Sequence, residues 1–570
     1  MLQKFPVQSG DKIKYKTSED TWKIATVVER AGKVTGNRSG WYNVLGEDGS
    51  PFGINLDKNS DWFTVNETEN VNIVTIPKHE HNTENCYKAK TVELQKLMDF
   101  DTYKTVSDNG QPRISTSWVL WQKGNVTRAR LVARGFEEDC QNNCDSPTIH
   151  KTSMRIFFSI VAYKQWPVKT TDIKSAFLQS KLLDRDVFIK PPKEAEVDEG
   201  KLWQLKRCLY GLNDAARQFF ESVVDILKDL GCYQSQHDPA LFYMKQDNKL
   251  VGMFVSHIDD FLHAGEKIFD ELVIDKLTNR FLAGKLETGH FHYVGFGVIQ
   301  TADSVVIDQN DYLTDFNIEV INPMRAVKKN QSLNDNELTQ LRSLVEKLNW
   351  LMQGTRPDLM FDMVELSTKF KKGMVEDLIR AIKVLRKAQT ELSSLTFPDL
   401  GEFQNWKIVV YTDAAHANLC DGFSSMGAQI VFLIGKQQKC ATIAWQGGKI
   451  KRVVKSTIAA EALSLLEGIE LAVYLKSVIS SLIEYQPPIE VVVDNRSVVE
   501  AINSTKLVDD KRLRLDISAI KQYMQSGEVQ NIRWCPGKLQ IADVMTKKGV
   551  SNLNILQILQ NGVFNIELPI

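Results

Sequence analysis

Two adjacent carboxylates, Asp259 and Asp260, lie between two apolar runs in the stretch VGMFVSHIDDFLHAG, residues 251–265. Val, Met, Phe and Leu on both sides favour two strands joined by a tight hairpin, with the acid pair at its tip. Neighbouring charges on half-buried strands need compensation, and a pair of divalent cations would supply it because hard cations prefer carboxylate oxygens. An exposed Asp-Asp turn is the alternative for this stretch alone.

A third candidate carboxylate, Asp172, stands at the end of a predicted strand in PVKTTDIKSAFLQ, residues 167–179. The chain turns toward helix after it, and a lone Asp in such a place is usually a cap or turn residue. Together with Asp259 and Asp260 it would complete a set of metal ligands. Two divalent ions about 4 Å apart suit in-line phosphoryl transfer, in which one activates a 3′ oxygen and the other stabilises the leaving pyrophosphate.

A second series of acids lies in the C-terminal part of the chain. Asp413 and Asp494 end the apolar strands KIVVYTD and PIEVVVD, Glu461 lies in the second turn of a predicted long helix, and Asp543 follows near the end. The predicted elements are strands over 407–413, 427–434, 440–446, 488–494 and 529–534, with a helix over 456–481 and the Asp543 segment over 541–547. Each acid alone would be a cap or a surface charge, but functional sites cluster at strand ends.

Arginines alternate along the segment TRARLVARGF, residues 127–136. Alternation on a strand places Arg128, Arg130 and Arg134 on one face. That face would hold a triphosphate or a template backbone. An exposed cationic edge strand is the competing interpretation.

The motifs LVARGF, TTDIKSAFLQ, LWQLKRCLYGLNDAARQF, SHIDDF and TRPDLMF occur in this order. Together they closely resemble the reverse transcriptase of copia-like LTR retrotransposons, from roughly residue 89 to the C-terminus. The resemblance implies a multidomain α+β and α/β chain. We therefore expect a right-hand polymerase with fingers, palm, thumb and connection, followed by a ribonuclease H-like domain, with a small N-terminal β-barrel-like module.

By this resemblance, Asp172, Asp259 and Asp260 are the polymerase metal ligands. The resemblance also implies that Arg128 or Arg130 contacts the incoming triphosphate, and the sequence does not decide which. The cofactor implied is Mg²⁺, two ions for each active site, with Mn²⁺ as a substitute.

Phe177 stands where the family places an aromatic gate against the ribose 2′-hydroxyl, which implies a preference for DNA precursors. Core packing is its alternative role. Tyr210 and Gly211 would lie in the nucleotide pocket. Two positions depart from related enzymes: many have Tyr where this chain has His257, and retroviral enzymes carry Gln at position 210. A packed, neutral imidazole is expected for His257, although a histidine can titrate near neutral pH.

The order of the C-terminal elements resembles ribonuclease H, and Asp413, Glu461, Asp494 and Asp543 match its four metal ligands. Such a site would hydrolyse RNA with two magnesium ions. The loop CPGKLQIAD lacks the His that many cellular ribonucleases H carry before the final Asp. A basic run beside the helix would grip the hybrid or form a solvated loop; it comprises Lys436, Lys439, Lys449, Lys451, Arg452 and Lys455.

Composition limits the class of protein. The chain has 570 residues, 43% of them hydrophobic and 25% charged, which predicts several folded domains. Eight scattered Cys indicate reduced intracellular thiols. No apolar run approaches the roughly 20 residues of a membrane span, and the N-terminus has no signal-peptide core, so no membrane partner is expected. The formal net charge of −1 assigns any nucleic-acid binding to local basic surfaces.

The predicted domains are a β-rich, SH3- or chromo-like module over 1–75, a linker over 76–90, fingers and palm over 91–265, thumb and connection over 266–400, and ribonuclease H over 401–570. The module would be an integrase tail, since integrase precedes reverse transcriptase in copia-like polyproteins. Neither a protease motif nor an integrase core is visible, which suggests a processed or truncated product. His79, His81 and Cys86 lack a fourth ligand, so the linker interpretation is preferred over a metal site.

Several helices are expected to position these residues. They are predicted over 91–98, 154–164, 271–281 and 336–353, and a hairpin over 291–299 and 304–307. The helix at 154–164 would bury Ile156, Phe157, Ile160 and Val161. A cationic stretch would track phosphates of a duplex or form a solvated helix face; it comprises Lys369, Lys371, Lys372, Arg380, Lys383, Arg386 and Lys387.

The leading hypothesis is an RNA- and DNA-dependent DNA polymerase with ribonuclease H activity. Its partners would be an RNA template, a DNA primer, the RNA–DNA hybrid and dNTPs, with a homodimer as a further state. Related elements imply a cytoplasmic location in virus-like particles, or a nuclear one with the integration complex. The alternative is a host-adopted, inactive nucleic-acid-binding or scaffold protein. Retention of all seven acids opposes it, because unfilled carboxylate clusters repel each other.

Overall fold

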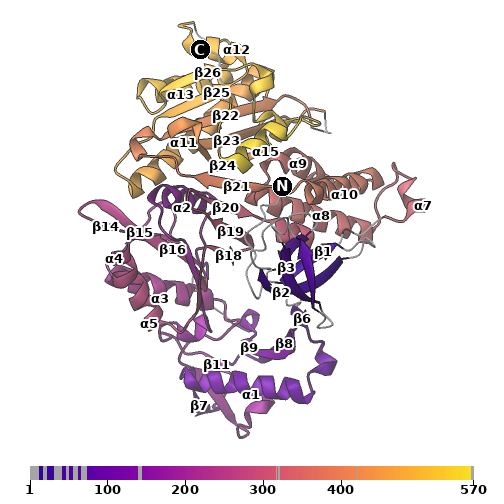
Figure 1. Ribbon diagram of the computed structural model, residues 1–570, viewed down its shortest axis with the longest axis vertical. Helices are drawn as coiled ribbons and strands as arrows, with labels where there is room; N and C mark the ends of the chain where they lie inside the picture. The colour runs from indigo at the N-terminus through magenta and orange to yellow at the C-terminus, as the bar shows by residue number, and fades with distance from the viewer. Residues whose placement is uncertain are drawn as a thin grey trace. The chain divides into compact units, whose positions relative to one another are not determined.

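The computed structural model describes residues 73–138, 144–315, 318, 321–419, 422–506 and 508–566, together with the backbone of five strands before residue 66. The chain forms two compact units. The first contains residues 1–96, 117–132 and 192–196, and the second contains the remainder. Figure 1 shows the elements and their labels. No described helix combines the length and the apolar character that crossing a membrane requires.

The first unit holds two antiparallel sheets. Its N-terminal sheet has the order β4-β3-β2-β1-β5, with β1 at Lys12–Lys16, β2 at Trp22–Arg30, β3 at Trp41–Gly46, β4 at Pro51–Asn55 and β5 at Trp62–Val65. These five strands agree with the β-rich character predicted for residues 1–75, whereas closure into an SH3-like barrel stays a prediction. The second sheet joins β6 (Ile73–Thr75), β8 (Thr116–Lys123) and β9 (Val126–Ala133).

Helix α1 (Glu84–Asp99) begins seven residues before the predicted helix at 91–98. Residues 84–90 were expected in a linker because they are polar, but Cys86 and Ala89 are buried with Leu120 and Ala129 in a small core. Lys90 also pairs with Glu194 at 2.8 Å. Tertiary burial therefore extends the helix beyond its amphipathic pattern. Cys86 is buried here and joins no cluster of metal-ligating side chains among the described residues.

The second unit contains a six-stranded sheet of order β13-β14-β15-β16-β10-β17, which carries Asp172 and Asp260 from the region predicted as the palm and is called the palm sheet below. Its strands are β10 (Lys169–Ile173), β13 (Tyr233–Gln234), β14 (Leu241–Gln246), β15 (Lys249–His257), β16 (Asp260–Gly265) and β17 (Ala283–Thr288). A separate three-stranded sheet joins β11 (Phe188–Ile189), β12 (Lys201–Leu205) and β7 (Tyr103–Ser107).

Helices cover both faces of the palm sheet, which explains the nearly continuous apolar run on β15. Met253 and Val255 share a core with residues of α2 (Lys151–Lys164). Phe254, on the opposite face because strand side chains alternate, packs in the cluster of α3 (Ala215–Asp229). The α2 core includes all four residues predicted to be buried there, Ile156, Phe157, Ile160 and Val161.

A four-stranded antiparallel sheet and several helices follow the palm sheet along the chain. The sheet has the order β18-β19-β20-β21, with β18 at His290–Tyr293, β19 at Phe296–Gln300, β20 at Ser304–Asp308 and β21 at Ser394–Pro398. The segment 291–299, predicted as one strand, therefore turns at Val294 and Gly295, both with positive φ. The helices are α4 (Lys267–Phe269), α5 (Asp275–Arg280), α6 (Asn310–Thr314), α7 (Pro323–Ala326), α8 (Asp335–Gly354), α9 (Met360–Ser367) and α10 (Val375–Thr390).

The C-terminal sheet has the order β24-β23-β22-β25-β26, in which β22 runs parallel to β25 and β25 parallel to β26 (Figure 1). Its strands are β22 (Lys407–Ala415), β23 (Met426–Ile434), β24 (Cys440–Lys449), β25 (Ile489–Val493) and β26 (Asn531–Trp534). The helices are α11 (Thr457–Leu482), α12 (Arg496–Asn503), α13 (Lys511–Gln525), α14 (Asp543–Thr546) and α15 (Leu553–Asn561). The predicted element order is confirmed.

Candidate active sites

Asp259 and Asp260 lie at a hairpin, as the apolar runs predicted, and together with Asp172 they are the three acids predicted for the palm, called the palm acids below. β15 and β16 pair antiparallel with His257 opposite Asp260, so Ile258 and Asp259 form the turn. Ile258 has φ 59°, a left-handed conformation that is rare for a β-branched residue. Such strain persists where the surrounding structure imposes it, and it is frequent at functional sites.

Asp172 on β10 stands directly opposite Asp260 on β16 in the strand register. The Ile173 amide donates to the Asp259 carbonyl at 2.9 Å and fixes the turn against β10. A Cβ at Gly284 would lie 1.8 Å from Oδ1 of Asp172, so any larger residue would displace this carboxylate from its position. Sequence reasoning missed Gly284, although a glycine within a strand often marks a close approach.

The electrostatics of the palm set are repulsive. Burial, with the charges of Asp259 and Asp172, raises the pKa of Asp260 to about 6. Asp172 and Asp259 themselves are exposed. Hard oxygen ligands that repel each other fit a divalent cation, which would relieve the repulsion. Burial lowers the pKa of His257, which agrees with the predicted neutral imidazole.

The rings of Phe177 and Tyr210 contact each other, with centroids 5.1 Å apart. Tyr210 is buried, and Phe177 is half-buried against the α3 core, so part of its ring stays exposed. The Tyr210 carbonyl accepts from the Ala133 amide at 2.8 Å. Gly211, with φ 89°, accepts from the Gly135 amide at 3.1 Å. The LYGLND and ARGF motifs, far apart in sequence, thus form one local structure.

Arg128 and Arg130 are exposed and alternate with buried Ala129 and Leu131 on β9, as the strand pattern predicted. Both belong to the first unit, whereas the palm acids belong to the second. Their contact with a triphosphate stays a prediction.

The predicted cationic stretch at 369–387 is partly neutralised. Arg380 pairs with Asp362 and Glu365, and Lys387 lies 3.7 Å from Glu391. The charge of Arg380 is therefore compensated inside the protein by these two carboxylates, which makes Arg380 a structural residue and a poor candidate for binding phosphates.

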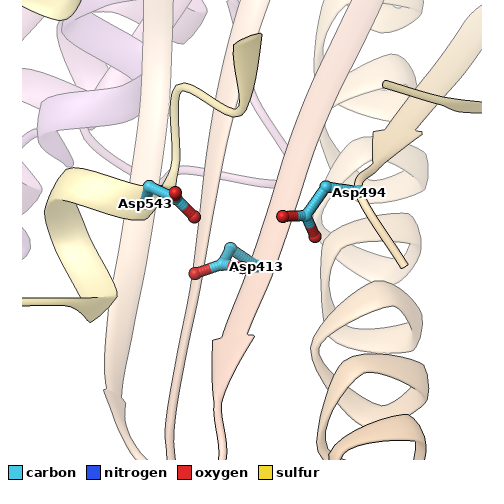
Figure 2. Close-up of side chains that lie close together, drawn as sticks. All are labelled: Asp413, Asp494 and Asp543. Carbon is cyan, nitrogen blue, oxygen red and sulfur yellow. The ribbon is translucent and has the colours of Figure 1, made fainter. Parts of the chain in front are cut away.

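The C-terminal acids lie closer together than the palm acids do. Asp413 on β22, Asp494 just after β25 and Asp543 at the start of α14 point toward a common space, as Figure 2 shows. One ligand atom from each lies within 4.8 Å of the others. In the described part of the chain, they are the only such group of three. Asp413 is fully buried, and Glu461 on α11 is 5% exposed.

The pKa values of Glu461, Asp494 and Asp543 are all raised, first by burial and then by the charges of neighbouring acids. Burial and then the charges of Asp413 and Asp494 raise the pKa of Glu461 to about 9. Burial and Asp413 raise the pKa of Asp543 to about 6 and also raise that of Asp494. Glu461 Oε2 is buried without a hydrogen-bond partner. Buried, repelling oxygens with an unpaired acceptor fit a divalent metal ion such as Mg²⁺ or Mn²⁺.

Lys547 and Thr546 are site residues that sequence reasoning missed. The Lys547 ammonium lies 3.3 Å from Asp413 Oδ1 and 2.5 Å from Asp543 Oδ1. The Thr546 hydroxyl donates to Asp413 Oδ2. Burial alone would lower the pKa of Lys547, but Asp413 and Asp543 raise it. The four-residue spacing from Asp543 to Lys547 was the available signal, since such pairs face each other on a helix.

Replacing Lys547 by Met should destabilise the metal-free chain by about 1–2 kcal/mol, because a half-buried ammonium no longer offsets the Asp413–Asp543 repulsion. Thermal unfolding in EDTA measures the loss. Millimolar Mg²⁺ should narrow the gap to wild type, since a bound cation would replace the lost charge. Lys548→Met, at the exposed neighbouring position, is the matched control and should leave unfolding unchanged.

The metal-free chain should lose stability as pH rises from about 5 to 9. The pKa of Glu461 lies near 9 in the folded state, against 4.5 ordinarily, so the folded state holds a proton that the unfolded state has released. The unfolding free energy therefore falls with pH, by at most about 1.4 kcal/mol per unit for one proton. Urea unfolding in EDTA across this range tests it, and Asp413→Asn should flatten the slope.

Residues 100–327 match the family model described as reverse transcriptase (RNA-dependent DNA polymerase). The chain is 26% identical over 471 residues to the retrovirus-related Pol polyprotein from transposon RE2 of Arabidopsis thaliana, covering 76% of this chain and 31% of that protein. It is 25% identical over 450 residues to the corresponding protein from transposon TNT 1-94 of Nicotiana tabacum, covering 72% and 33%. The predicted resemblance to copia-like reverse transcriptases is confirmed by these matches.

The chain spans about a third of the length of these curated relatives. Among solved structures, it is similar to the foamy viral protease-reverse transcriptase in complex with double-stranded DNA, at 12% identity and TM-score 0.46, covering 93% of each chain. It is also similar to LC11-RNase H1, at 18% identity and TM-score 0.20, covering 25% of this chain and 92% of that one.

Proposed function

We propose that this chain is an RNA- and DNA-dependent DNA polymerase that also hydrolyses the RNA strand of RNA–DNA hybrids. The observation that carries the proposal is the convergence of Asp413, Asp494 and Asp543 within 4.8 Å, in a chain whose palm hairpin holds a second acid set. One set of carboxylates serves each reaction. The family match over residues 100–327 supports the polymerase assignment.

In DNA synthesis, Asp172, Asp259 and Asp260 would hold magnesium, which when bound activates a 3′ oxygen and stabilises leaving pyrophosphate. The protein's own residues orient the nucleotide. Phe177 is half-buried beside Tyr210, and its exposed part would face the sugar of a bound nucleotide. A ribose 2′-hydroxyl would contact the Phe177 side chain, so we expect dNTPs to be preferred over ribonucleotides.

In RNA hydrolysis, Asp413, Glu461, Asp494 and Asp543 would hold magnesium, which when bound makes water nucleophilic near neutral pH. The buried position of Asp413 excludes bulk water and strengthens its charge interactions. The Lys547 ammonium pairs with both Asp413 and Asp543 and so offsets part of the repulsion between these carboxylates.

A groove beside this site supplies a binding surface for the hybrid. It has a volume of about 550 Å³ and is lined by Gln429, Gln446, Gly447, Lys449, Lys451 and Glu467, among others. Arg452, from the same basic run, pairs with Asp516. Lys449 and Lys451 carry positive charge toward phosphates, which gives binding that weakens with salt.

Primer extension on an end-labelled RNA template tests both activities in one tube. With dNTPs and Mg²⁺, we expect DNA extension together with template cleavage, and neither reaction in EDTA. Cleavage without extension would contradict the polymerase assignment for this chain. Hybrid binding without either reaction would favour the inactive nucleic-acid-binding alternative.

A further inference from the structure

The C-terminal end of α8 is completed by side chains from two other parts of the chain. The last four carbonyls of a helix lack intrahelical partners. Leu351 O accepts from the amides of Thr355 and Arg356, both at 3.0 Å. The Met352 carbonyl accepts from Trp445 Nε1 at 2.8 Å. The carbonyls of Gln353 and Gly354 accept from Arg155 Nη2 at 2.5 and 2.9 Å.

Arg155 carries a buried charge that no carboxylate neutralises among the described ion pairs. It is 3% exposed, and its Cζ lies 3.6 Å from the centroid of the Trp445 ring. The negative end of the α8 dipole and the electron-rich ring face compensate the guanidinium. Burial lowers the pKa of Arg155 to about 9, which leaves the side chain charged at neutral pH.

An apolar side chain would fill this space at lower cost, since burying a charge is expensive. The guanidinium instead makes contacts that depend on orientation. Its donors fix α2 against the end of α8, and its planar face fixes Trp445 above it. Arg155 Nε is buried without a partner, which raises the cost further. We infer that this oriented contact, which we call the joint at Arg155, serves to hold α2, the end of α8 and Trp445 in one relative arrangement.

The contact joins the frameworks of the two acid sets. α2 leads directly into β10, which carries Asp172. β24, which carries Trp445, belongs to the same sheet as β22 and Asp413. A second contact is more peripheral: Lys245 donates to the Ser481 carbonyl at 3.1 Å.

We propose that Arg155 is a positioning residue that fixes the spacing between the polymerase and ribonuclease H sites, and so determines how far behind the primer 3′ end the RNA is cut. The inference rests on the proposed function. If one hybrid occupies both sites, a fixed spacing between them selects one phosphodiester of the RNA. If the joint at Arg155 is lost and the two sites move relative to each other, several neighbouring phosphodiester bonds of the RNA can reach the ribonuclease H site.

The test maps cuts in a 5′-labelled RNA annealed to a DNA primer with a recessed 3′ end, using the full chain with Mg²⁺ and no dNTPs. Wild type should cut within a narrow window. Arg155→Met and Trp445→Leu should each raise the fraction of cuts outside that window by about threefold or more, as expected for loss of one pairwise coupling. The double variant should spread the cuts less than the sum of the two single effects, because both substitutions remove the Arg155–Trp445 contact.

Two controls distinguish a change in the spacing of the two sites from a general loss of cleavage activity. Total cleavage of a hybrid without a recessed primer end should stay at the wild-type rate in both variants. Lys151→Met is the matched control, because Lys151 lies on the same helix, 4.3 Å from the Trp350 ring centroid, and donates to Gln353 Oε1 at 3.2 Å, so that both of these partners belong to α8. It should keep the wild-type cut window.

An unchanged cut window in Arg155→Met, with wild type active, would overturn the inference and leave the proposed function intact. Absence of cutting by wild type would instead contradict the proposed function. If Arg155→Met does not fold, Arg155→Lys and Trp445→Phe replace it. Lys keeps the charge and a donor, and Phe keeps the ring face but loses the bond to Met352. Each should widen the window less than Trp445→Leu, and a wild-type window in both would overturn the proposal.

Discussion

Asp259→Asn or Asp260→Asn should abolish DNA synthesis, with at least about a thousandfold loss of primer extension. Asn keeps the size of the side chain but removes the anionic oxygens that a divalent cation requires. Asp260 is the more sensitive position, because it is half-buried at the start of β16 and faces Asp172 across the strand pair. Cleavage of a preformed hybrid should continue at the wild-type rate, since the second acid set is untouched.

Asp247→Asn is the matched control for this experiment. Asp247 lies with Asn248 in the turn at the other end of β15, and both have positive φ. Asn tolerates that conformation, so the same charge is removed without strain. Extension by this variant should equal wild type. Normal extension by both Asp259→Asn and Asp260→Asn would disprove the palm assignment.

Asp413→Asn should abolish RNA cleavage by a similar factor while DNA synthesis continues. Asp413 is the fully buried centre of its cluster and contributes to the raised pKa values of Glu461, Asp494 and Asp543. Removing its charge also relieves their repulsion. The variant should therefore unfold at a higher temperature than wild type in EDTA, which a merely damaged fold would not do.

Asp509→Asn, at an exposed position before α13, serves as the charge-matched control. It should leave both cleavage and unfolding unchanged. Measuring cleavage and EDTA stability on the same preparations distinguishes loss of a ligand from loss of the fold. If Asp413→Asn cleaves RNA at the wild-type rate, the acids serve the fold and not the reaction.

Local patterns were sufficient to predict most elements. The apolar runs around Asp259 predicted β15 and β16, and the helix expected at 336–353 is α8, Asp335–Gly354. The positions of Asp172, Asp413 and Asp494 at the ends of strands were predictable for the same reason, because strand periodicity and turn position depend on neighbouring residues. Boundaries were less predictable: α1 begins at Glu84 because Cys86 and Ala89 find a core formed by β8 and β9.

The sequence by itself determined which residues could do chemistry, since spaced carboxylates and the motifs around them are local and ordered along the chain. Only the tertiary structure decided their surroundings. Gly284 lies beneath Asp172, Lys547 joins Asp413 to Asp543, and Arg155 meets Trp445 across nearly 300 residues of chain. Such contacts depend on how sheets and helices stack, and the energy of burying a charge is set by that packing and not by sequence neighbours.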